Sequence, residues 1–106
     1  MGLFDFLQHR DINEEVARCR ATPGAVLLDV RAPEEYAQGH IPGSVNLPLA
    51  AVAEAKHRFV DRTTPLFVYC LSGGRSRSAV AALEQMGFTN VVDMGGISAY
   101  RGAVER

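Results

Sequence analysis

The residues best suited to chemistry in this sequence follow a single apolar run. Positions 65–69 (PLFVY) lead into Cys70, and the six residues after it are Leu71, Ser72, Gly73, Gly74, Arg75 and Ser76. A loop of this composition between a strand and a helix can direct backbone N–H groups inward. Such amides, together with the positive end of a helix, lower the pKa of a cysteine. The pattern predicts that Cys70 is a catalytic nucleophile and that residues 71–76 form a substrate- or anion-binding loop.

The two cysteines of the chain invite different interpretations. For Cys70 the alternative is an inert buried thiol, because free cysteine is among the most buried residue types; its place at the mouth of the loop favours the nucleophile. Cys19 lies near Val16 on a predicted helix, where a small apolar packing residue is the simpler interpretation. Neither cysteine has the spacing of a metal ligand, so we expect no metal site.

The elements that would position this loop alternate in type along the chain. Strands are predicted near 25–30, 45–47, 65–69 and 90–93, and helices near 11–20, 33–38, 50–59, 76–86 and 97–100. We expect Ser76 to cap the helix after the loop. Strands separated by helices predict an α/β domain with a mostly parallel sheet, in which ligands bind at the carboxyl ends of strands. Cys70 and Asp29 both fall at such ends.

Size and composition limit the possible function. The 106 residues suffice for one ordinary domain, with 47% hydrophobic and 22% charged residues. The formal net charge of −1 gives no reason to expect nucleic acid or an anionic membrane as the main partner. Two cysteines without a recognisable signal peptide predict a cytoplasmic protein in which Cys70 remains a free thiol.

The chain begins with an apolar segment, residues 1–10, in which Phe4 and Phe6 contribute to an apolar face. We expect this segment to dock on a domain formed by residues 11–106. The alternative is a docking patch for a partner or a membrane surface.

Three ordered motifs resemble the rhodanese-like (sulfurtransferase) domains across about residues 11–102. They are LLDVRAPEEYAQGHIPGSVNLPL, the loop CLSGGRS, and GFTNVVDMGGISAYRG. The resemblance implies an α/β rhodanese-like fold, with a mostly parallel sheet of about five short strands and helices on both faces. It implies a sulfurtransferase that uses a Cys70 persulfide and no metal or organic cofactor. The expected substrates are a small sulfur donor, such as thiosulfate or a persulfide, and a thiol or cyanide acceptor.

The resemblance also suggests roles for residues around Cys70. Arg75 follows Cys70 by five positions, as in the six-residue loop of sulfurtransferases, whereas related phosphatases use a loop that is one residue longer. Arg75 is expected to orient the loop or to bind an anion, and Asp29 and Arg31 are expected to support the site. His40 is interpreted as a structural hydrogen-bonding residue.

Two alternatives to a sulfurtransferase stay open at this point. The first is a persulfide carrier or binding module that acts with a protein partner, which the apolar Leu71 beside the thiol favours. The second is a phosphatase or arsenate reductase of the same fold, against which the loop length argues.

Overall fold

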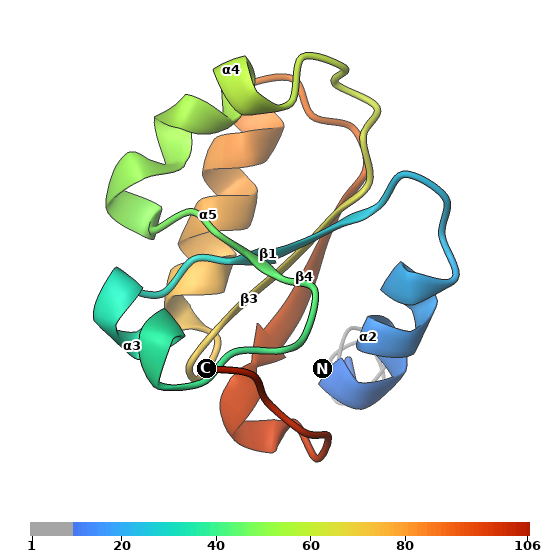
Figure 1. The fold of residues 1–106 in the computed structure, drawn as a ribbon. Helices are drawn as coiled ribbons and strands as arrows, with labels where there is room; N and C mark the ends of the chain where they lie inside the picture. Colours follow the sequence, from blue (N-terminus) through green and yellow to red (C-terminus); the bar gives the residue numbers. More distant parts are fainter. Residues whose placement is uncertain (1–9) are drawn as a thin grey trace, which may run out of the picture.

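A parallel four-stranded sheet forms the centre of the molecule (Figure 1). The computed structural model describes residues 10–106, so all of the predicted 1–10 segment except Arg10 lies outside the described residues. The strand order is β2-β1-β3-β4, and every neighbouring pair is parallel. The strands are β1 (Val26–Asp29), β2 (Val45–Asn46), β3 (Leu66–Cys70) and β4 (Val91–Gly96). The α/β class with a parallel sheet is confirmed, and the described residues hold four strands where about five were expected.

Helices cover both faces of the sheet (Figure 1), as predicted. The helices and 3₁₀ turns are α2 (Ile12–Arg20), α3 (Pro33–Gln38), η1 (Leu49–Glu54), α4 (Ala55–Arg58), α5 (Gly74–Gln85) and η2 (Ile97–Ala99). Side chains alternate between the two faces along β3. Leu66, Val68 and Cys70 belong to the apolar cluster that includes residues of α4 and α5, whereas Phe67 and Tyr69 belong to the cluster that includes residues of α2. Cys70 is therefore positioned on the α5 side of the sheet.

Helix α2 begins where the sequence predicts it. The Asp11 side chain caps α2 by accepting a hydrogen bond from the Asn13 N–H at 2.9 Å. Asp is a favoured residue at this position because its oxygen satisfies one of the free amides of the first turn. The helix ends at Arg20, as predicted, with its buried side chains against the sheet.

Two other elements differ from prediction. The single helix expected over 50–59 is instead the 3₁₀ segment η1 followed by the single turn α4. Within η1, Ala51 leaves the helical region, with φ −110° and ψ 15°, and kinks the chain. Strand β4 continues three residues beyond Asp93 to Gly96. An irregularity in its pairing with β3 falls between Val68 and Tyr69, beside Gly95, whose φ is +89°.

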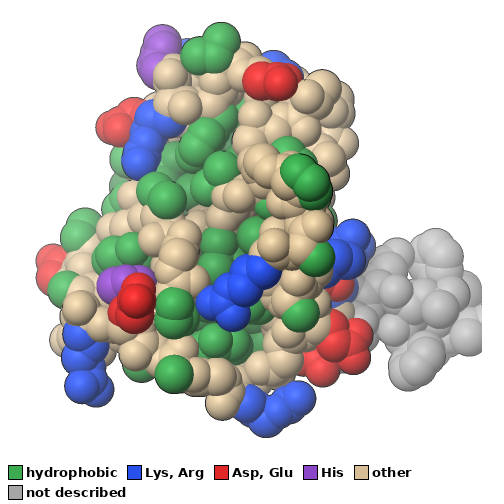
Figure 2. Space-filling view, turned by 45° about the vertical axis from the view of Figure 1, so that its right-hand side comes forward, with side chains coloured by type: hydrophobic (Ala, Val, Ile, Leu, Met, Phe, Trp, Pro, Cys, Tyr) green, Lys and Arg blue, Asp and Glu red, His purple; other side chains and the backbone are tan. Residues whose placement is uncertain are grey.

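Charged side chains of both signs are scattered over the face shown in Figure 2, between exposed apolar ones. This distribution agrees with the near-neutral net charge of −1. Within residues 10–106, no helix has the length and apolar character needed to cross a membrane.

Candidate active site

Cys70 is the last residue of β3, at the carboxyl edge of the parallel sheet. Its relative exposure is only 1%, so its sulfur lies at the base of the loop that follows. We call residues 70–76 the Cys70 loop. The Gly73 N–H donates a hydrogen bond to the Cys70 sulfur at 3.0 Å. The loop thus folds back over the thiol, with at least one amide directed at the sulfur.

The loop amides change the acidity of the thiol. Burial by itself raises the pKa of Cys70. Hydrogen bonds from the Ser76 side chain and from the backbone N–H groups of Ser76, Gly73 and Ser72 favour the thiolate. These hydrogen bonds outweigh burial, and the pKa of Cys70 lies below its ordinary value. The donors that favour the thiolate of this buried sulfur therefore belong to the protein itself and not to solvent.

The backbone of Gly73 starts helix α5. Its φ of +112° is in the left-handed region, which residues with a side chain rarely adopt. Gly73 is the N-cap of α5, so the helix begins at Gly74, two residues before the predicted start. The prediction that Ser76 caps the helix is wrong. The left-handed turn at Gly73 directs the Gly73 N–H at the sulfur and starts the helix at Gly74, so Ser76 already lies within the helix.

Ser76 instead lies inside the first turn of α5 and is fully buried. Its hydroxyl oxygen is 2.8 Å from an Asp93 carboxylate oxygen and 3.0 Å from the Gly73 carbonyl oxygen. The hydroxyl has a single proton, so it serves Asp93, Gly73 or the Cys70 sulfur one at a time. The backbone amides do not depend on this rotation and give the constant part of the stabilisation of the thiolate.

Arg75 forms a two-pronged ion pair with Glu35, the third residue of α3. The two contacts are 2.6 Å and 3.0 Å long. Arg75 lowers the pKa of the Glu35 carboxyl to about 2, and the same carboxylate accepts the Ala32 N–H at 3.0 Å. The sequence suggested a loop-orienting or anion-binding cation here, and the anion beside it in the structure is a protein carboxylate. The pair fastens the Cys70 loop to α3.

Glu35 is the residue that the sequence reasoning missed. It is 40 positions from Arg75 in the chain. One signal was available: the segment after β1 and the segment after β3 leave the same edge of a parallel sheet, so acids following Asp29 should lie near cations following Cys70.

The outer part of the Cys70 loop packs on the start of η2. The Ser98 N–H donates to the Leu71 carbonyl at 3.1 Å. A Cβ atom placed on Gly96 would lie 2.2 Å from that carbonyl oxygen and 2.6 Å from the Ser72 Cα. Only glycine fits at position 96. The Leu71 side chain is 44% exposed beside this contact.

Asp29 and Arg31 form a buried ion pair next to the site. One Arg31 guanidinium nitrogen is 2.8 Å from an Asp29 oxygen and also donates to the Gly39 carbonyl at 2.7 Å. Their side chains are 0% and 6% exposed, respectively. The pair fixes the turn after α3 through Gly39. Its charges also act on the neighbouring ion pair, because Arg31 lowers the pKa of Glu35 and Asp29 raises the pKa of Arg75.

His40 is a structural hydrogen-bonding residue, as predicted. Its Nδ1 is 2.8 Å from the Tyr36 carbonyl oxygen, and its ring stacks on the Tyr36 ring with 3.7 Å between centroids. In the described residues, no group of three or more His, Cys, Asp or Glu side chains is arranged to hold a metal ion.

The family model for the rhodanese-like domain matches residues 13–103. The chain belongs to the rhodanese-like domain family. It is similar to the thiosulfate sulfurtransferase PspE of Escherichia coli (strain K12), with 41% identity over 71 residues that cover 66% of this chain and 68% of the relative. It is also similar to the thiosulfate sulfurtransferase GlpE of Pseudomonas entomophila (strain L48), with 38% identity over 84% of this chain and 81% of that one.

A solved structure supports the same assignment. The structure described as a rhodanese with anions from E. coli superimposes with a TM-score of 0.71 at 34% identity, over 77% of this chain and 98% of that chain. The rhodanese fold expected from the motifs is confirmed, and the chain is a sulfurtransferase of this family.

Proposed function

We propose that this rhodanese-like domain transfers sulfane sulfur through a persulfide on Cys70. In the first step the Cys70 thiolate attacks the outer sulfur of thiosulfate or of another persulfide. A bond forms between the two sulfurs, and the donor's own sulfur–sulfur bond breaks. Its electron pair leaves with sulfite or with the donor thiolate. An acceptor thiolate or cyanide then attacks the outer sulfur, and Cys70 departs as a thiolate.

The observation that carries this proposal is the Gly73 N–H directed at the Cys70 sulfur, in a site where the pKa of the thiol is lowered despite burial. A low-pKa thiolate is both a good attacking group and a good leaving group, so both half-reactions benefit. Leu71, Ser72, Gly73, Gly74, Arg75 and Ser76 make up the binding loop. Asp29, the last residue of the neighbouring strand β1, and Arg31, two residues further on, support it. None of these steps needs a metal or an organic cofactor.

The exposure of Cys70 favours a small or terminal sulfur as the incoming group. Because only 1% of Cys70 is exposed, a donor can reach the sulfur only with a narrow terminal group. Within the loop the Arg75 charge is paired with Glu35, so the loop offers no unpaired cation of its own to a doubly charged donor. Persulfides are therefore expected to be used at least as well as thiosulfate.

Mass spectrometry of the intact protein after incubation with thiosulfate tests the proposal. The unmodified sequence should gain one sulfur atom and lose it again on addition of cyanide. Cys70→Ser should gain none, because serine retains the size of the side chain but is a poor nucleophile at neutral pH. Cys19→Ser should gain the sulfur normally. A Cys70→Ser protein that still takes up sulfur, or a wild type that never does, would overturn the assignment.

A persulfide carrier that serves a protein partner is the second candidate. The exposed Leu71 side chain next to the thiol favours it, because an apolar group at the mouth of the loop suits a protein surface better than a small anion. A stable complex with a partner and negligible turnover of small donors would identify a carrier. Hydrolysis of an aryl phosphate by the purified protein would instead indicate the phosphatase alternative.

We further propose that residues 11–106 form the domain and that it works in the cytoplasm. The family match over 13–103 supports the boundary. Cys19 and Cys70 are both free thiols, which suits a reducing compartment.

A further inference from the structure

The hydroxyl of Ser76 is surrounded by hydrogen-bond acceptors. Its oxygen lies 2.8 Å from an Asp93 carboxylate oxygen, 3.0 Å from the Gly73 carbonyl oxygen and 3.5 Å from the Gly95 carbonyl oxygen. The fourth acceptor is the Cys70 sulfur, whose charged form a hydrogen bond from the same hydroxyl favours. Ser76 is 0% exposed, so the competition is decided among groups of the protein. One hydroxyl proton therefore has four possible acceptors.

A carboxylate and a thiolate are the strong competitors among these acceptors. The Gly73 carbonyl already accepts the Arg77 N–H at 3.2 Å. The Gly95 carbonyl, at 3.5 Å, is at the outer limit of hydrogen-bond distance. Hydrogen bonds to ionised acceptors are roughly twice as strong as those between neutral groups. The hydroxyl proton is therefore divided mainly between Asp93 and the thiolate of Cys70.

The fold brings Asp93 and Cys70 to the same helix, although they are far apart in the sequence. Asp93 pairs with Val68 in the ladder between β4 and β3, and Cys70 follows Val68 by two positions. Alternate residues of a strand share a face of the sheet, so Cys70 and Asp93 lie on the same face on neighbouring strands. The first turn of α5, which contains Ser76, packs on this face. The Ser76 hydroxyl thus lies between the two strands.

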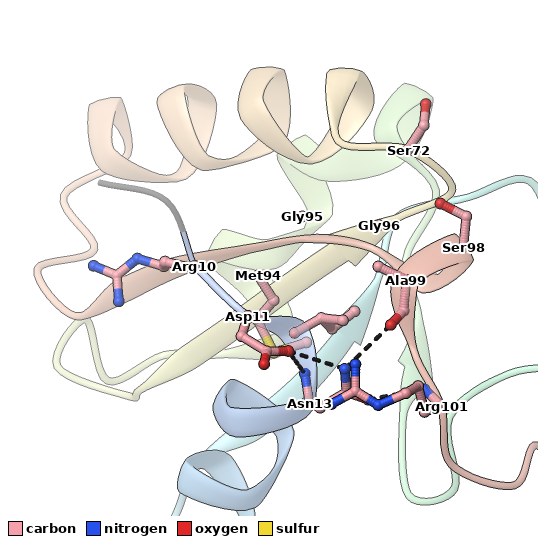
Figure 3. A pocket seen from close by; sticks show the side chains of 11 residues that line it. Arg10, Asp11, Asn13, Ser72, Met94, Gly95, Gly96, Ser98, Ala99 and Arg101 are labelled. Atoms are coloured by element: carbon pink, nitrogen blue, oxygen red, sulfur yellow. Dashed lines mark hydrogen bonds between the residues drawn. The ribbon is translucent and has the colours of Figure 1, made fainter. Parts of the chain in front are cut away.

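The surroundings of Asp93 and of Ser76 differ in their access to solvent. A groove of about 500 Å³ lies beside the Cys70 loop, between the start of α2, the end of β4 and η2 (Figure 3). A smaller cavity of about 290 Å³ shares part of its wall with this groove and is lined by Asp93, Arg10 and Arg77, among others. Neither cavity has Ser76 or Cys70 in its wall. Asp93 thus has solvent on one side, whereas its contact with Ser76 lies inside the protein.

Three further charged groups act around Cys70, from α5, α3 and the end of β1. Glu35 of α3 raises the pKa of the Arg75 guanidinium through its hydrogen bonds. The nearby charges of Cys70 and Asp29 raise the pKa of Arg75 further. Arg75, Glu35 and Asp29 are each held in an ion pair. Asp93 differs from these groups because it shares a hydrogen-bond donor with the sulfur.

We propose that Asp93 is a positioning residue for sulfur transfer, because its carboxylate competes with the Cys70 sulfur for the single proton of the Ser76 hydroxyl. The inference rests on the proposed sulfur transfer and names a residue that acts on Cys70 through Ser76. When the hydroxyl donates to Asp93, the thiolate has one donor fewer and is the stronger nucleophile. When the hydroxyl donates to the sulfur, the thiolate is the better leaving group.

The hydroxyl changes its acceptor during the reaction without giving up its proton. In the first half-reaction the Cys70 thiolate forms a bond to the outer sulfur of the donor, and the donor's sulfur–sulfur bond breaks with its electron pair. The inner sulfur of the persulfide is then uncharged, and the hydroxyl donates to Asp93. When the acceptor attacks the outer sulfur, the bond to Cys70 breaks and its electron pair returns to Cys70. The hydroxyl then turns toward the charged sulfur.

Titration of the thiolate by its ultraviolet absorbance tests this competition in a double-mutant cycle. Asp93→Asn keeps a side-chain oxygen for the Gly95 N–H but replaces the carboxylate with a neutral, weaker acceptor. The Ser76 proton should then move toward the sulfur, and the pKa of Cys70 should fall by about half a unit. In the Ser76→Ala background the same substitution should shift the pKa of Cys70 by less than half as much, because no hydroxyl remains to be redirected.

The matched control is Asp61→Asn. The Asp61 carboxylate makes the same kind of contacts, because it accepts the Thr63 N–H at 2.9 Å and the Thr63 hydroxyl at 2.6 Å. Asp61 precedes β3, whereas Cys70 is the last residue of that strand. Asp61→Asn should therefore leave the pKa of Cys70 unchanged.

Three results of the titrations would overturn the proposal. A shift that persists by more than half in the Ser76→Ala background would show that the Asp93 charge acts directly on the sulfur. A pKa of Cys70 that does not fall in Asp93→Asn would show that the carboxylate does not compete for the proton. An equal shift in Asp61→Asn would show that the effect is not specific to Asp93.

The rates of the two half-reactions test the consequence for catalysis and distinguish it from damage to the fold. The comparison uses thiosulfate as donor and cyanide as acceptor, at a pH at which Cys70 is a thiolate in both proteins. Asp93→Asn should take up sulfur roughly twofold more slowly and release it to cyanide roughly twofold faster. A loosened loop would instead slow both steps. Quenched-flow mass spectrometry of the intact protein measures both rates, and changes of the same sign, or no change in either step, would overturn the proposal.

The titration does not require sulfur transfer, so this inference and the proposed function can fail separately. A shift that depends on the Ser76 hydroxyl, without any persulfide on wild-type Cys70, would retain the competition for the proton and reject the sulfur transfer. A wild-type persulfide that forms and discharges normally, with no such shift in Asp93→Asn, would reject the role of Asp93 and retain the sulfur transfer.

Discussion

Cys19 and Cys70 are both buried and both free, yet their surroundings push their acidities in opposite directions. Cys19 is 5% exposed in the apolar cluster under α2, and burial raises the pKa of its thiol. Cys70 is more deeply buried, at 1% exposed, and the pKa of its thiol is lowered. The difference indicates that directed hydrogen-bond donors, rather than contact with solvent, lower the pKa of a buried cysteine in this fold.

The largest effect should come from displacing the loop that carries those donors. Gly96→Ala places a Cβ 2.2 Å from the Leu71 carbonyl oxygen, so the loop backbone must shift. We expect kcat/KM for sulfur transfer to fall on the order of a hundredfold, because catalytic groups tolerate little misplacement. Steady-state assays with thiosulfate and cyanide measure this loss.

Gly74→Ala controls for the general cost of adding a methyl group to glycine. A Cβ at Gly74 meets no atom within 4 Å, and Gly74 is helical, so the free energy of unfolding should not fall. If Gly96→Ala retained wild-type activity, the close packing of the loop on η2 would not matter for the thiolate.

The next effect should come from Ser76→Ala. It removes a buried hydroxyl that bonds Asp93 at 2.8 Å and that also favours the Cys70 thiolate. Losing one such donor should raise the pKa of Cys70 by about half a unit to one unit and reduce kcat/KM about tenfold. The pH dependence of kcat/KM measures both changes. A Cys70 pKa unchanged in Ser76→Ala would show that the backbone amides alone hold the thiolate.

A smaller effect, dependent on pH, should follow from Glu35→Gln. Because Arg75 lowers the pKa of Glu35 to about 2 from 4.5, this ion pair stabilises the folded state fully above about pH 4.5. The contribution disappears as the pH falls from there toward 2. Both side chains are about one-third exposed, so solvent limits the contribution to about 1 kcal/mol.

Urea unfolding of wild type and Glu35→Gln at several pH values measures this difference. The two free energies of unfolding should differ at pH 7 and converge toward pH 2, and sulfur transfer at pH 7 should fall about threefold because the loop is less firmly held. A difference that persists unchanged at pH 2 would show that Glu35 acts by packing rather than by charge.

The smallest effect is expected at the other cysteine. Cys19→Ala should change kcat/KM by less than about twofold, since the side chain lies on the buried face of α2, in an apolar cluster that contains no residue of the Cys70 loop. It should lower the free energy of unfolding by about 1 kcal/mol through the small cavity it leaves. A large loss of sulfur transfer in Cys19→Ala would identify Cys19 as a second catalytic thiol. The contrast between the two cysteines would then be wrong.

Much of the fold could be predicted because its elements are local patterns. Asp11 marks the start of α2, and the apolar run that ends at Cys70 is a buried strand. What the sequence did not predict depends on contacts between distant segments. The pairing of Arg75 with Glu35 and of Ser76 with Asp93 joins residues 40 and 17 positions apart. The start of α5 at Gly74 depends on a left-handed glycine, because Gly73 and Gly74 look equally suitable in the sequence.

The site divides in the same way. Cys70 and its glycine-rich loop are contiguous in sequence, so their chemistry can be read from residue types and spacing. The groove beside the loop is lined by residues from the start of α2, the Cys70 loop and the end of β4 with η2, including Arg10, Ser72, Gly96 and Arg101. No local sequence pattern predicts it.

The most direct test of the central claim is the titration of the Cys70 thiolate by its ultraviolet absorbance, as the difference between wild type and Cys70→Ser. This measurement needs no reagent to reach a sulfur that is 1% exposed. A midpoint clearly below about 8.5, the value of an ordinary thiol, is the predicted result. A midpoint at or above that value would show that the loop amides do not hold the charge on Cys70, and would contradict the account.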